Sequence, residues 1–424
     1  MSQVNPNLSR IVQETQAIDV HSHQGAQSVW QARNLWEILS YHWLAVDLCC
    51  AGCPREILWS KDIDPRDGVR EAAKWSKLTR NTVNHWCFMN IARDLYGFRD
   101  PYLDEHNWEW LADAVDEKLG DPQWEAHVLD QAGVEQASAR IGNPPHLPER
   151  YFMYEYGEYL FCPSVRRNVQ ESLTQIGPGI TSAAQLRQAI ADNVKFLAAA
   201  HNLRALHMWV PLTWTYQPVE EGRAESLLHK ALANVRLEHA EQDALGSFTA
   251  DCTAEIAGEL GIVLQLFCGS LKLEWHGLDV SVYRPEWLRA LAPLLSKHPK
   301  TQFDIFLAAR NLSHEAAVMS RVYPNMWVSG AWWQAFTPSS MTEFFRDRLE
   351  MLPMNKWNAF FSDGWCVEWV YGKSTMSRSR LALALSEIVE EGLVTEDTAA
   401  EMARMVLYEN PKRLYGLGAE EGAC

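Results

Sequence analysis

The sequence predicts an α/β protein built as a (β/α)8 barrel of the TIM type, with an α-helical insertion after the first strand. Short apolar runs rich in β-formers recur between longer stretches with helical periodicity, which is the pattern of a βα repeat. Eight such runs occur, and one long stretch after the first is rich in tryptophan and helical in pattern. With 424 residues, of which 47% are hydrophobic, the chain can bury a large core.

The expected strands are short, apolar and rich in β-branched or aromatic residues. They are residues 17–23, 134–141, 156–161, 204–210, 262–267, 302–308, 326–330 and 358–363. Parallel strands that alternate with helices close into a barrel, and the catalytic groups of such barrels lie at the carboxyl ends of the strands.

Helical periodicity separates most of these runs. The expected helices are residues 183–200, 247–260, 285–297 and 313–322, with Pro285 in the first turn of its helix. Residues 376–408 are expected to form a further pair of helices.

Residues 30–128 do not fit a single βα unit, because the stretch is long and its apolar residues recur at helical spacing. We therefore predict that residues 1–29 and 129–424 form a metal-dependent (β/α)8 barrel. Residues 30–128 are predicted to form an α-helical insertion that covers the barrel mouth.

Two histidines, His21 and His23, stand one residue apart at the end of the first expected strand. Side chains alternate along a strand, so both imidazoles point to the same side, an arrangement that suits one metal ion. Asp363 ends the eighth expected strand, which closes next to the first in a barrel, so the three side chains can converge. Paired histidines also occur on ordinary surfaces, and the spacing alone leaves the metal site a hypothesis.

The formal net charge of -16 argues against nucleic acid or an anionic membrane surface as a partner, because no basic stripe offsets the acids. A small-molecule substrate is expected instead. The amino terminus lacks a basic region followed by an apolar one, and no run approaches about 18 apolar residues, so we expect a cytoplasmic protein. Nine scattered cysteines, among them Cys50 and Cys53, are expected to be reduced thiols.

Motifs along most of the chain resemble the amidohydrolase superfamily, and within it the uronate isomerases, particularly their shorter bacterial variants. The histidine pair within an Asp-x-His-x-His motif is general to the superfamily, whereas a Tyr-His helix and a Trp-Trp pair are more specific. The residues that carry the resemblance are 19–23, 34–43, 330–333, 362–363 and 410–415.

This resemblance implies that His21, His23 and Asp363 bind one divalent metal ion, for which zinc is expected. It also implies an isomerase that interconverts an aldose acid and a ketose acid by moving a proton between C1 and C2. Such a reaction requires a base, a group that polarises the carbonyl and a cation for the sugar carboxylate. Asp363 is the expected base, and His42 is expected to orient a substrate hydroxyl.

Three positions depart from the pattern of the uronate isomerases. Trp43 replaces the tyrosine that usually follows the matched histidine, and Trp365 replaces the arginine that usually lies two residues after the aspartate. Residues 160–163 read Leu-Phe-Cys-Pro where an arginine would help to hold the carboxylate. Bidentate arginine contacts are the strongest available to a carboxylate, so uronate binding should be weakened. Arg310 is the one cation still placed near the pocket, although a surface role suits it equally well.

Aromatic side chains are expected to line the pocket, and they suit an apolar or aromatic ring as well as the CH faces of a sugar. They are Trp43, Trp209, Trp214, Phe267, Trp332, Trp333 and Trp365. One alternative function is therefore hydrolysis, decarboxylation or carbon–carbon cleavage of a ring-bearing substrate at the same metal ion. A second alternative is a metal-binding protein without catalysis. The aromatic-rich insertion leaves a homo-oligomer open but locates no interface.

Overall fold

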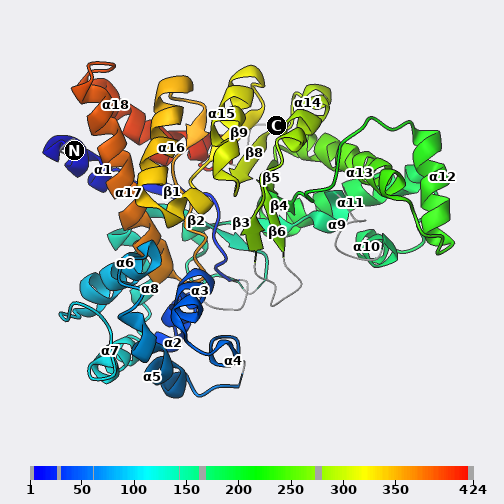
Figure 1. Ribbon diagram of the computed structural model, residues 1–424. Coiled ribbons are helices and arrows are strands. Elements are labelled where there is room, and N and C mark those ends of the chain that lie inside the picture. Colours follow the sequence, from blue (N-terminus) through cyan, green and yellow to red (C-terminus); the bar gives the residue numbers. More distant parts are fainter. Residues whose placement is uncertain are drawn as a thin grey trace. The chain divides into compact units, whose positions relative to one another are not determined.

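The computed structural model describes residues 4–25, 30–60, 62–142, 144–161, 169–272 and 279–418 (Figure 1). Eight strands follow the order β1-β2-β3-β4-β5-β8-β9-β10, and the pairs β1–β2, β3–β4, β4–β5, β5–β8, β8–β9 and β9–β10 are parallel. Their bounds are β1 (Ala17–Asp19), β2 (Val134–Arg140), β3 (Tyr151–Tyr156), β4 (Leu203–Trp209), β5 (Val263–Cys268), β8 (Phe303–Leu307), β9 (Met326–Ser329) and β10 (Trp357–Asn358).

The chain divides into two compact units, each described here by itself. The first unit comprises Met1–Tyr151, Gln334–Arg346 and Ala359–Tyr408, and the second comprises Phe152–Trp333, Asp347–Asn358 and Glu409–Cys424. The division into a barrel and an insertion at residues 30–128 stays a prediction.

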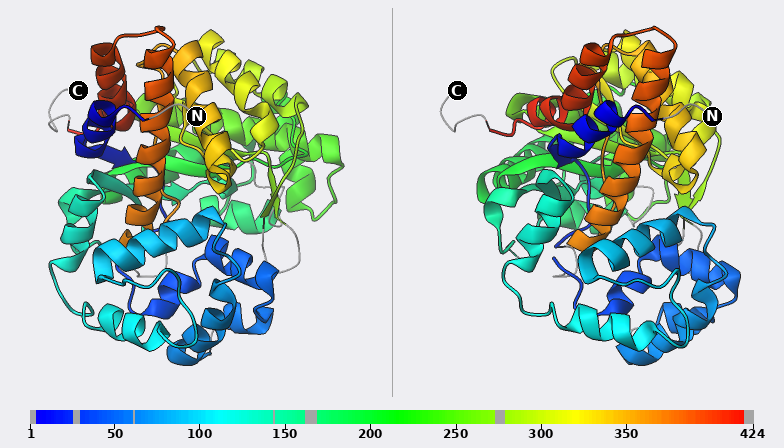
Figure 2. Two further views of the ribbon diagram at one scale, coloured as in Figure 1. Left: turned by 60° about the vertical axis from the view of Figure 1, so that its left-hand side comes forward. Right: turned by 90° about the vertical axis from the view of Figure 1, so that its left-hand side faces the viewer.

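The first unit contains β1, β2 and most of the helices at the two ends of the chain. The helices are α1 (Pro6–Glu14), α2 (Leu35–Leu39), α3 (His42–Ala51), α4 (Arg55–Leu58), α5 (Pro65–Ser76), α6 (Val83–Asn90), α7 (Trp108–Asp116), α8 (Trp124–Gln131), α17 (Val367–Glu390) and α18 (Glu396–Arg404), with π-helical turns at Ile91–Leu95 and Met405–Glu409. The long helix α17, orange in Figure 2, packs against α1, α6, α8 and α18.

A buried arginine on α17 fixes the approaches to the first two strands. Arg378 donates hydrogen bonds to the carbonyl oxygens of Thr15 at 2.7 Å and Gly133 at 2.8 Å, and also to that of Val12. Thr15 closely precedes β1 and Gly133 directly precedes β2. Since buried carbonyl groups require donors, the arginine holds both strand starts against α17.

The second unit contains β3 to β10 and the helices that accompany them. The helices are α9 (Glu158–Phe161), α10 (Val169–Ile176), α11 (Ala183–His201), α12 (Glu221–Leu232), α13 (His239–Leu260), α14 (Glu286–Lys297), α15 (Ser313–Val322) and α19 (Asn410–Leu414), with 3-10 turns at Arg310–Leu312 and Trp333–Phe336, while the 3-10 turn at Pro148–Arg150 belongs to the first unit. Some of these bounds cross the unit limits, as do those of α16 (Pro338–Met351). A short antiparallel pair, β6 (Ser270–Lys272) and β7 (Asp279–Ser281), follows β5 and was not predicted. No helix among the described residues is long and apolar enough to cross a membrane.

The predicted strand at residues 156–161 is wrong. The third strand is Tyr151–Tyr156, whose aromatic residues suit a buried sheet, and the chain then turns at Gly157. The amide of Leu160 donates to the carbonyl of Gly157, and Glu158–Phe161 form a helical turn. Leu160 and Phe161 therefore belong to a helix, while residues 162–163 lie outside the described residues.

The first and last predicted strands are longer than the observed ones. β1 ends at Asp19, and beyond it the main chain of His21 and His23 bonds to residues 363 and 364 instead of to β2. β10 comprises only Trp357–Asn358, and Ala359 already bonds to the carbonyl of Val406 instead of to a strand. The other strands and the helices at 183–200, 285–297 and 313–322 are confirmed to within two residues. The helices expected at 247–260 and from 376 begin eight and nine residues earlier, at His239 and Val367.

A polar network is buried among the strands of the second unit. Ser329 Oγ and the Tyr415 hydroxyl donate to Asp304 Oδ2 at 2.6 and 2.7 Å. Gln265 Nε2 donates to the Tyr415 hydroxyl and Asn358 Nδ2 to Ser329 Oγ. Asp304 Oδ1 has no hydrogen-bond partner within the described residues. Burial raises the pKa of Asp304 to about 7.

Asp304→Asn should therefore stabilise the protein above neutral pH. The unfolded carboxyl ionises near pH 3.8 whereas the folded one stays protonated to about pH 7, so wild-type stability falls as the pH rises between these values. At about 1.4 kcal/mol per pKa unit, the advantage of the variant is up to about 4 kcal/mol at pH 8. Thermal unfolding of both proteins from pH 4 to 8.5 measures it. A difference in Tm that does not grow between pH 4 and 7 would contradict the prediction.

Candidate metal centre

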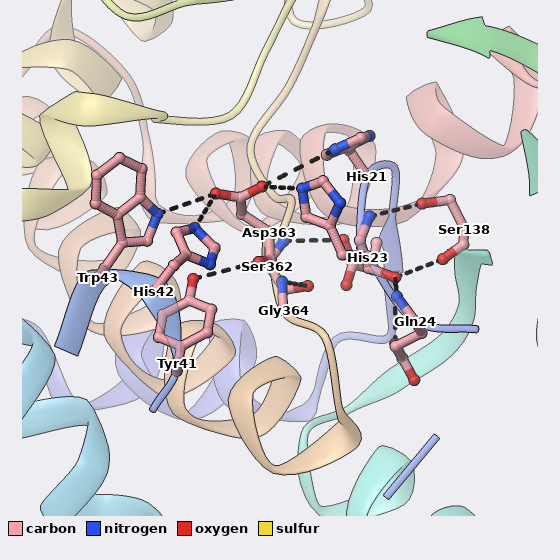
Figure 3. A network of polar contacts seen from close by, with 12 residues as sticks. His21, His23, Gln24, Tyr41, His42, Trp43, Ser138, Ser362, Asp363 and Gly364 are labelled. Atoms are coloured by element: carbon pink, nitrogen blue, oxygen red, sulfur yellow. Dashed lines mark hydrogen bonds and ion pairs between the residues drawn. The ribbon is translucent and has the colours of Figure 1, made fainter. Parts of the chain in front are cut away.

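Three side chains of the first unit form a cluster that can hold a metal ion. Ligand atoms of His21, His23 and Asp363 all lie within 4.8 Å of one another. His23 Nε2 lies 3.0 Å from Asp363 Oδ1, and His21 Nε2 lies 3.9 Å from the same oxygen (Figure 3). His21 is fully buried and Asp363 is 8% exposed. Two imidazoles and one carboxylate are a donor set that zinc and neighbouring divalent metals accept, with positions left for water or substrate.

Main-chain hydrogen bonds hold the ligands together although 340 positions separate His23 from Asp363. The Asp363 amide donates to the carbonyl of His21 at 3.1 Å, and the His23 amide donates to that of Gly364 at 2.8 Å. The two histidines thus lie just beyond β1 rather than within it. Their common orientation comes from this pairing with residues 363–364 and not from a strand that continues through them.

Asp363 adopts a left-handed backbone conformation with φ of 56°. This conformation costs an ordinary residue roughly 1–2 kcal/mol, and aspartate tolerates it better than most. The surroundings fix it, because the Gly364 amide donates to Ser362 Oγ and the Tyr41 hydroxyl donates to the Asp363 carbonyl at 3.2 Å. The backbone strain therefore lies at the residue whose carboxylate faces the histidines.

Both oxygens of the Asp363 carboxylate have nitrogen partners. Oδ1 faces the two histidines, while Oδ2 accepts a hydrogen bond from Trp43 Nε1 at 3.1 Å and lies 3.5 Å from His42 Nε2. Burial alone would raise the pKa of Asp363, but hydrogen bonds from His23 and His42 lower it well below the usual value. Burial lowers the pKa of His42. The carboxylate is therefore ionised beside a neutral His42 at neutral pH, as a ligand for a cation requires.

The aromatic residues expected around the pocket fall into two groups. Trp43 and Trp365 lie in the first unit, where the Trp365 ring contacts the His42 ring edge to face at 6.0 Å. Trp43 donates a hydrogen bond to the Asp363 carboxylate through its indole nitrogen, a contact that its sequence position did not reveal.

The second group lies in the second unit. Phe267 is its centre, with ring centroids 5.1 Å from Trp332 and 6.2 Å from Trp209, and Trp333 contacts Trp332 at 6.2 Å. Trp209 ends β4 and Phe267 lies near the end of β5, as predicted. Arg310 is an exposed residue in the 3-10 turn after β8.

The sequence motifs did not identify three residues whose hydrogen bonds position the site. Asp19, whose pKa burial raises to about 7, holds the Ser362 amide. Tyr41 holds the Asp363 carbonyl. Ser138 on β2 binds the amide and hydroxyl of Ser22, between the two histidines. The motif around Asp19 and Tyr41 was recognised, but nothing in the sequence assigns either residue this contact.

No protein-family model matches the chain. A curated uronate isomerase from Nostoc punctiforme is 26% identical over 271 residues, which cover 61% of this chain. The match spans 57% of the length of that relative. The uronate isomerase structure from Thermotoga maritima superimposes with a TM-score of 0.84 at 16% identity and covers 98% of both chains. The chain has the fold of the uronate isomerases.

A second solved structure, the glucuronate isomerase from Caulobacter crescentus, gives a TM-score of 0.85 at 17% identity over 99% of this chain and 97% of that one. The predicted (β/α)8 fold class and the predicted resemblance to uronate isomerases are thereby confirmed. At these identities the structural likeness concerns the fold.

Removing either imidazole should abolish metal binding by the first unit. His21→Ala and His23→Ala each leave two ligands, which hold a divalent ion poorly, so the bound metal should fall at least about tenfold. His106→Ala removes an exposed histidine and serves as the control. Equilibrium dialysis against zinc followed by elemental analysis measures the stoichiometry. Full zinc occupancy in both ligand variants would contradict this assignment.

Proposed function

We propose that the chain is a metal-dependent isomerase that interconverts the aldose and ketose forms of a hexuronate or a related sugar acid. The observation that carries the proposal is the cluster of His21, His23 and an ionised Asp363 in a chain with the fold of the uronate isomerases. The substrate is a small molecule, and the proposed location of the enzyme is the cytoplasm.

One divalent ion, for which we propose zinc, would be held by His21, His23 and Asp363. When bound, it would polarise the carbonyl oxygen of the sugar acid and so acidify the neighbouring C–H bond. The buried, two-nitrogen, one-oxygen donor set supports this assignment, because these ligands suit zinc.

Asp363 and His42 would move the proton between C1 and C2. Asp363 Oδ2 would take the proton from carbon, although hydrogen bonds to the carboxylate make it a weak base. His42 Nε2, 3.5 Å from that oxygen, is neutral at neutral pH and can receive the proton from it or orient a substrate hydroxyl. Trp43 would keep the carboxylate aligned during the transfer.

A second candidate function keeps the metal site and changes the reaction to hydrolysis, decarboxylation or carbon–carbon cleavage of a ring-bearing substrate. Two tryptophans support this function. Trp43 and Trp365 stand where the uronate isomerase pattern leads us to expect a tyrosine and an arginine. A metal-binding protein without catalysis would show neither activity.

Proton NMR in heavy water tests the isomerase directly. Zinc-loaded protein with D-glucuronate or D-galacturonate should produce ketose with deuterium at C1 and, through the reverse reaction, aldose with deuterium at C2, because the proton held by Asp363 or His42 exchanges with solvent. His21→Ala, prepared in the same way, should do neither. Wild-type protein that holds zinc yet leaves both sugars unlabelled and unconverted would refute the proposed function.

The double variant Trp43→Tyr, Trp365→Arg separates the two candidate reactions. It restores the expected tyrosine and arginine, so uronate turnover should rise severalfold if the chain is an isomerase, because the arginine adds a bidentate carboxylate contact. If the natural substrate is aromatic, the same variant should weaken the natural activity. Comparison of kcat/KM for uronates in wild type and variant measures the first effect, and an unchanged value would count against the isomerase expectation.

A further inference from the structure

A lysine is buried in the first unit with little to compensate its charge. Lys373 on α17 is 5% exposed, and its Nζ donates a hydrogen bond to Asn84 Oδ1 at 3.1 Å. Asn84 is itself oriented, since its Nδ2 donates to Asp47 Oδ2 at 3.0 Å. The Asn84 amide oxygen is thereby directed at the ammonium group of Lys373. The surroundings of residue 373 thus provide an acceptor for a lysine.

Three aromatic rings surround the rest of the ammonium group. The Nζ atom lies 5.5 Å from the ring centroid of Tyr41 and 5.8 Å from those of Phe336 and Trp369. Contacts of a cation with aromatic rings stabilise the charged form and leave its N–H groups without acceptors. Phe336 is half-buried, whereas Tyr41 and Trp369 are fully buried.

No carboxylate neutralises Lys373 at ion-pair distance among the residues that the structure describes. An ammonium group has three N–H donors, and one of them has an acceptor here. Lysines are almost never fully buried unless they are paired, because removing the charge from water is unfavourable. Burial accordingly lowers the pKa of Lys373. A ligand anion would complete this environment.

Two chains of contact connect Lys373 with the metal centre. Tyr41, one wall of the cage, donates its hydroxyl to the Asp363 carbonyl. Phe336, another wall, packs against the Trp43 ring at 4.6 Å, and Trp43 donates to Asp363 Oδ2. Tyr41 and Phe336 thus belong both to the surroundings of the ammonium group and to the contacts that lead to the Asp363 carboxylate.

The charge of the whole chain makes a local cation necessary for an acidic substrate. The net charge of -16 repels anions, and a site that takes a sugar acid must offset that field at short range. Trp365 stands where the expected arginine would have done so, and Arg310 lies exposed in the second unit. Within the first unit, Lys373 is a buried lysine whose cage shares Tyr41 and Phe336 with the surroundings of Asp363.

We propose that Lys373 is the substrate-binding cation of this enzyme and pairs with the carboxylate of the sugar acid at the metal centre. The inference rests on the proposed function and names the residue that gives this chain its preference for an anionic substrate. A lysine retained only for packing would make no distinction between an acid and its amide.

The test compares the binding of D-glucuronate with that of D-glucuronamide, its uncharged amide, to zinc-loaded protein by isothermal titration calorimetry. Wild type should prefer the acid. Lys373→Met should weaken acid binding about 10- to 100-fold and leave amide binding unchanged, whereas Lys373→Arg should keep the preference. Lys74→Met, which removes an exposed lysine paired with Glu71, is the matched control for net charge and should behave as wild type.

The stability of the variant separates a binding role from a structural one. Methionine fills the cage without a charge, so the Tm of Lys373→Met should equal or exceed that of wild type. Lys373→Gln provides a second neutral variant should methionine prevent folding. Acid preference that persists in a folded neutral variant, or is absent from wild type, overturns the inference. Acid preference that depends on Lys373 without ketose formation would instead refute the proposed isomerase and retain the lysine as the anion-binding group.

Discussion

The pairing of residues 21–23 with residues 363–364 is the constraint on which the candidate site depends. Two main-chain hydrogen bonds join segments from opposite ends of the chain, and each bond lies directly beside a metal-ligand residue. The approach to β1 is held in turn by Arg378 on α17, the helix that follows Asp363. Residues 21–23, residues 363–364 and helix α17 are thus linked to one another. Together they set the spacing of the histidines, the direction of the carboxylate and the position of Lys373.

The two oxygens of the Asp363 carboxylate have different partners. Oδ1 lies at hydrogen-bonding distance from His23 Nε2, and it is the oxygen that would face an ion held together with the two histidines. Oδ2 accepts the hydrogen bond from Trp43 and lies near His42. An ion held by the cluster would therefore occupy one side of the carboxylate and leave the side that faces the proposed proton path.

The sequence was sufficient to predict the fold class and to nominate His21, His23, Asp363 and His42, because local motifs and the closure of a barrel carry that information. Strand three was misplaced because Leu160 and Phe161 are as apolar as a strand, and only the turn at Gly157 decides that they form a helix. Lys373 could not be recognised from sequence, since its meaning comes from Tyr41, Phe336 and Asn84, which lie on other elements. Tertiary surroundings, not periodicity, identify a buried charge.

The left-handed conformation of Asp363 also limits how this site can evolve. A side chain at that φ meets its own backbone, and only glycine, asparagine and aspartate adopt the conformation readily. Glutamate, cysteine or histidine, the other common metal ligands, would need a compensating change in the loop at residues 362–364. A single substitution of Asp363 by asparagine or glycine keeps this backbone conformation and removes the carboxylate. Replacing the aspartate with another type of metal ligand is far more difficult in a single step. A new reaction is therefore expected to evolve through substitutions of the residues around Asp363, among them positions 43, 365 and 373.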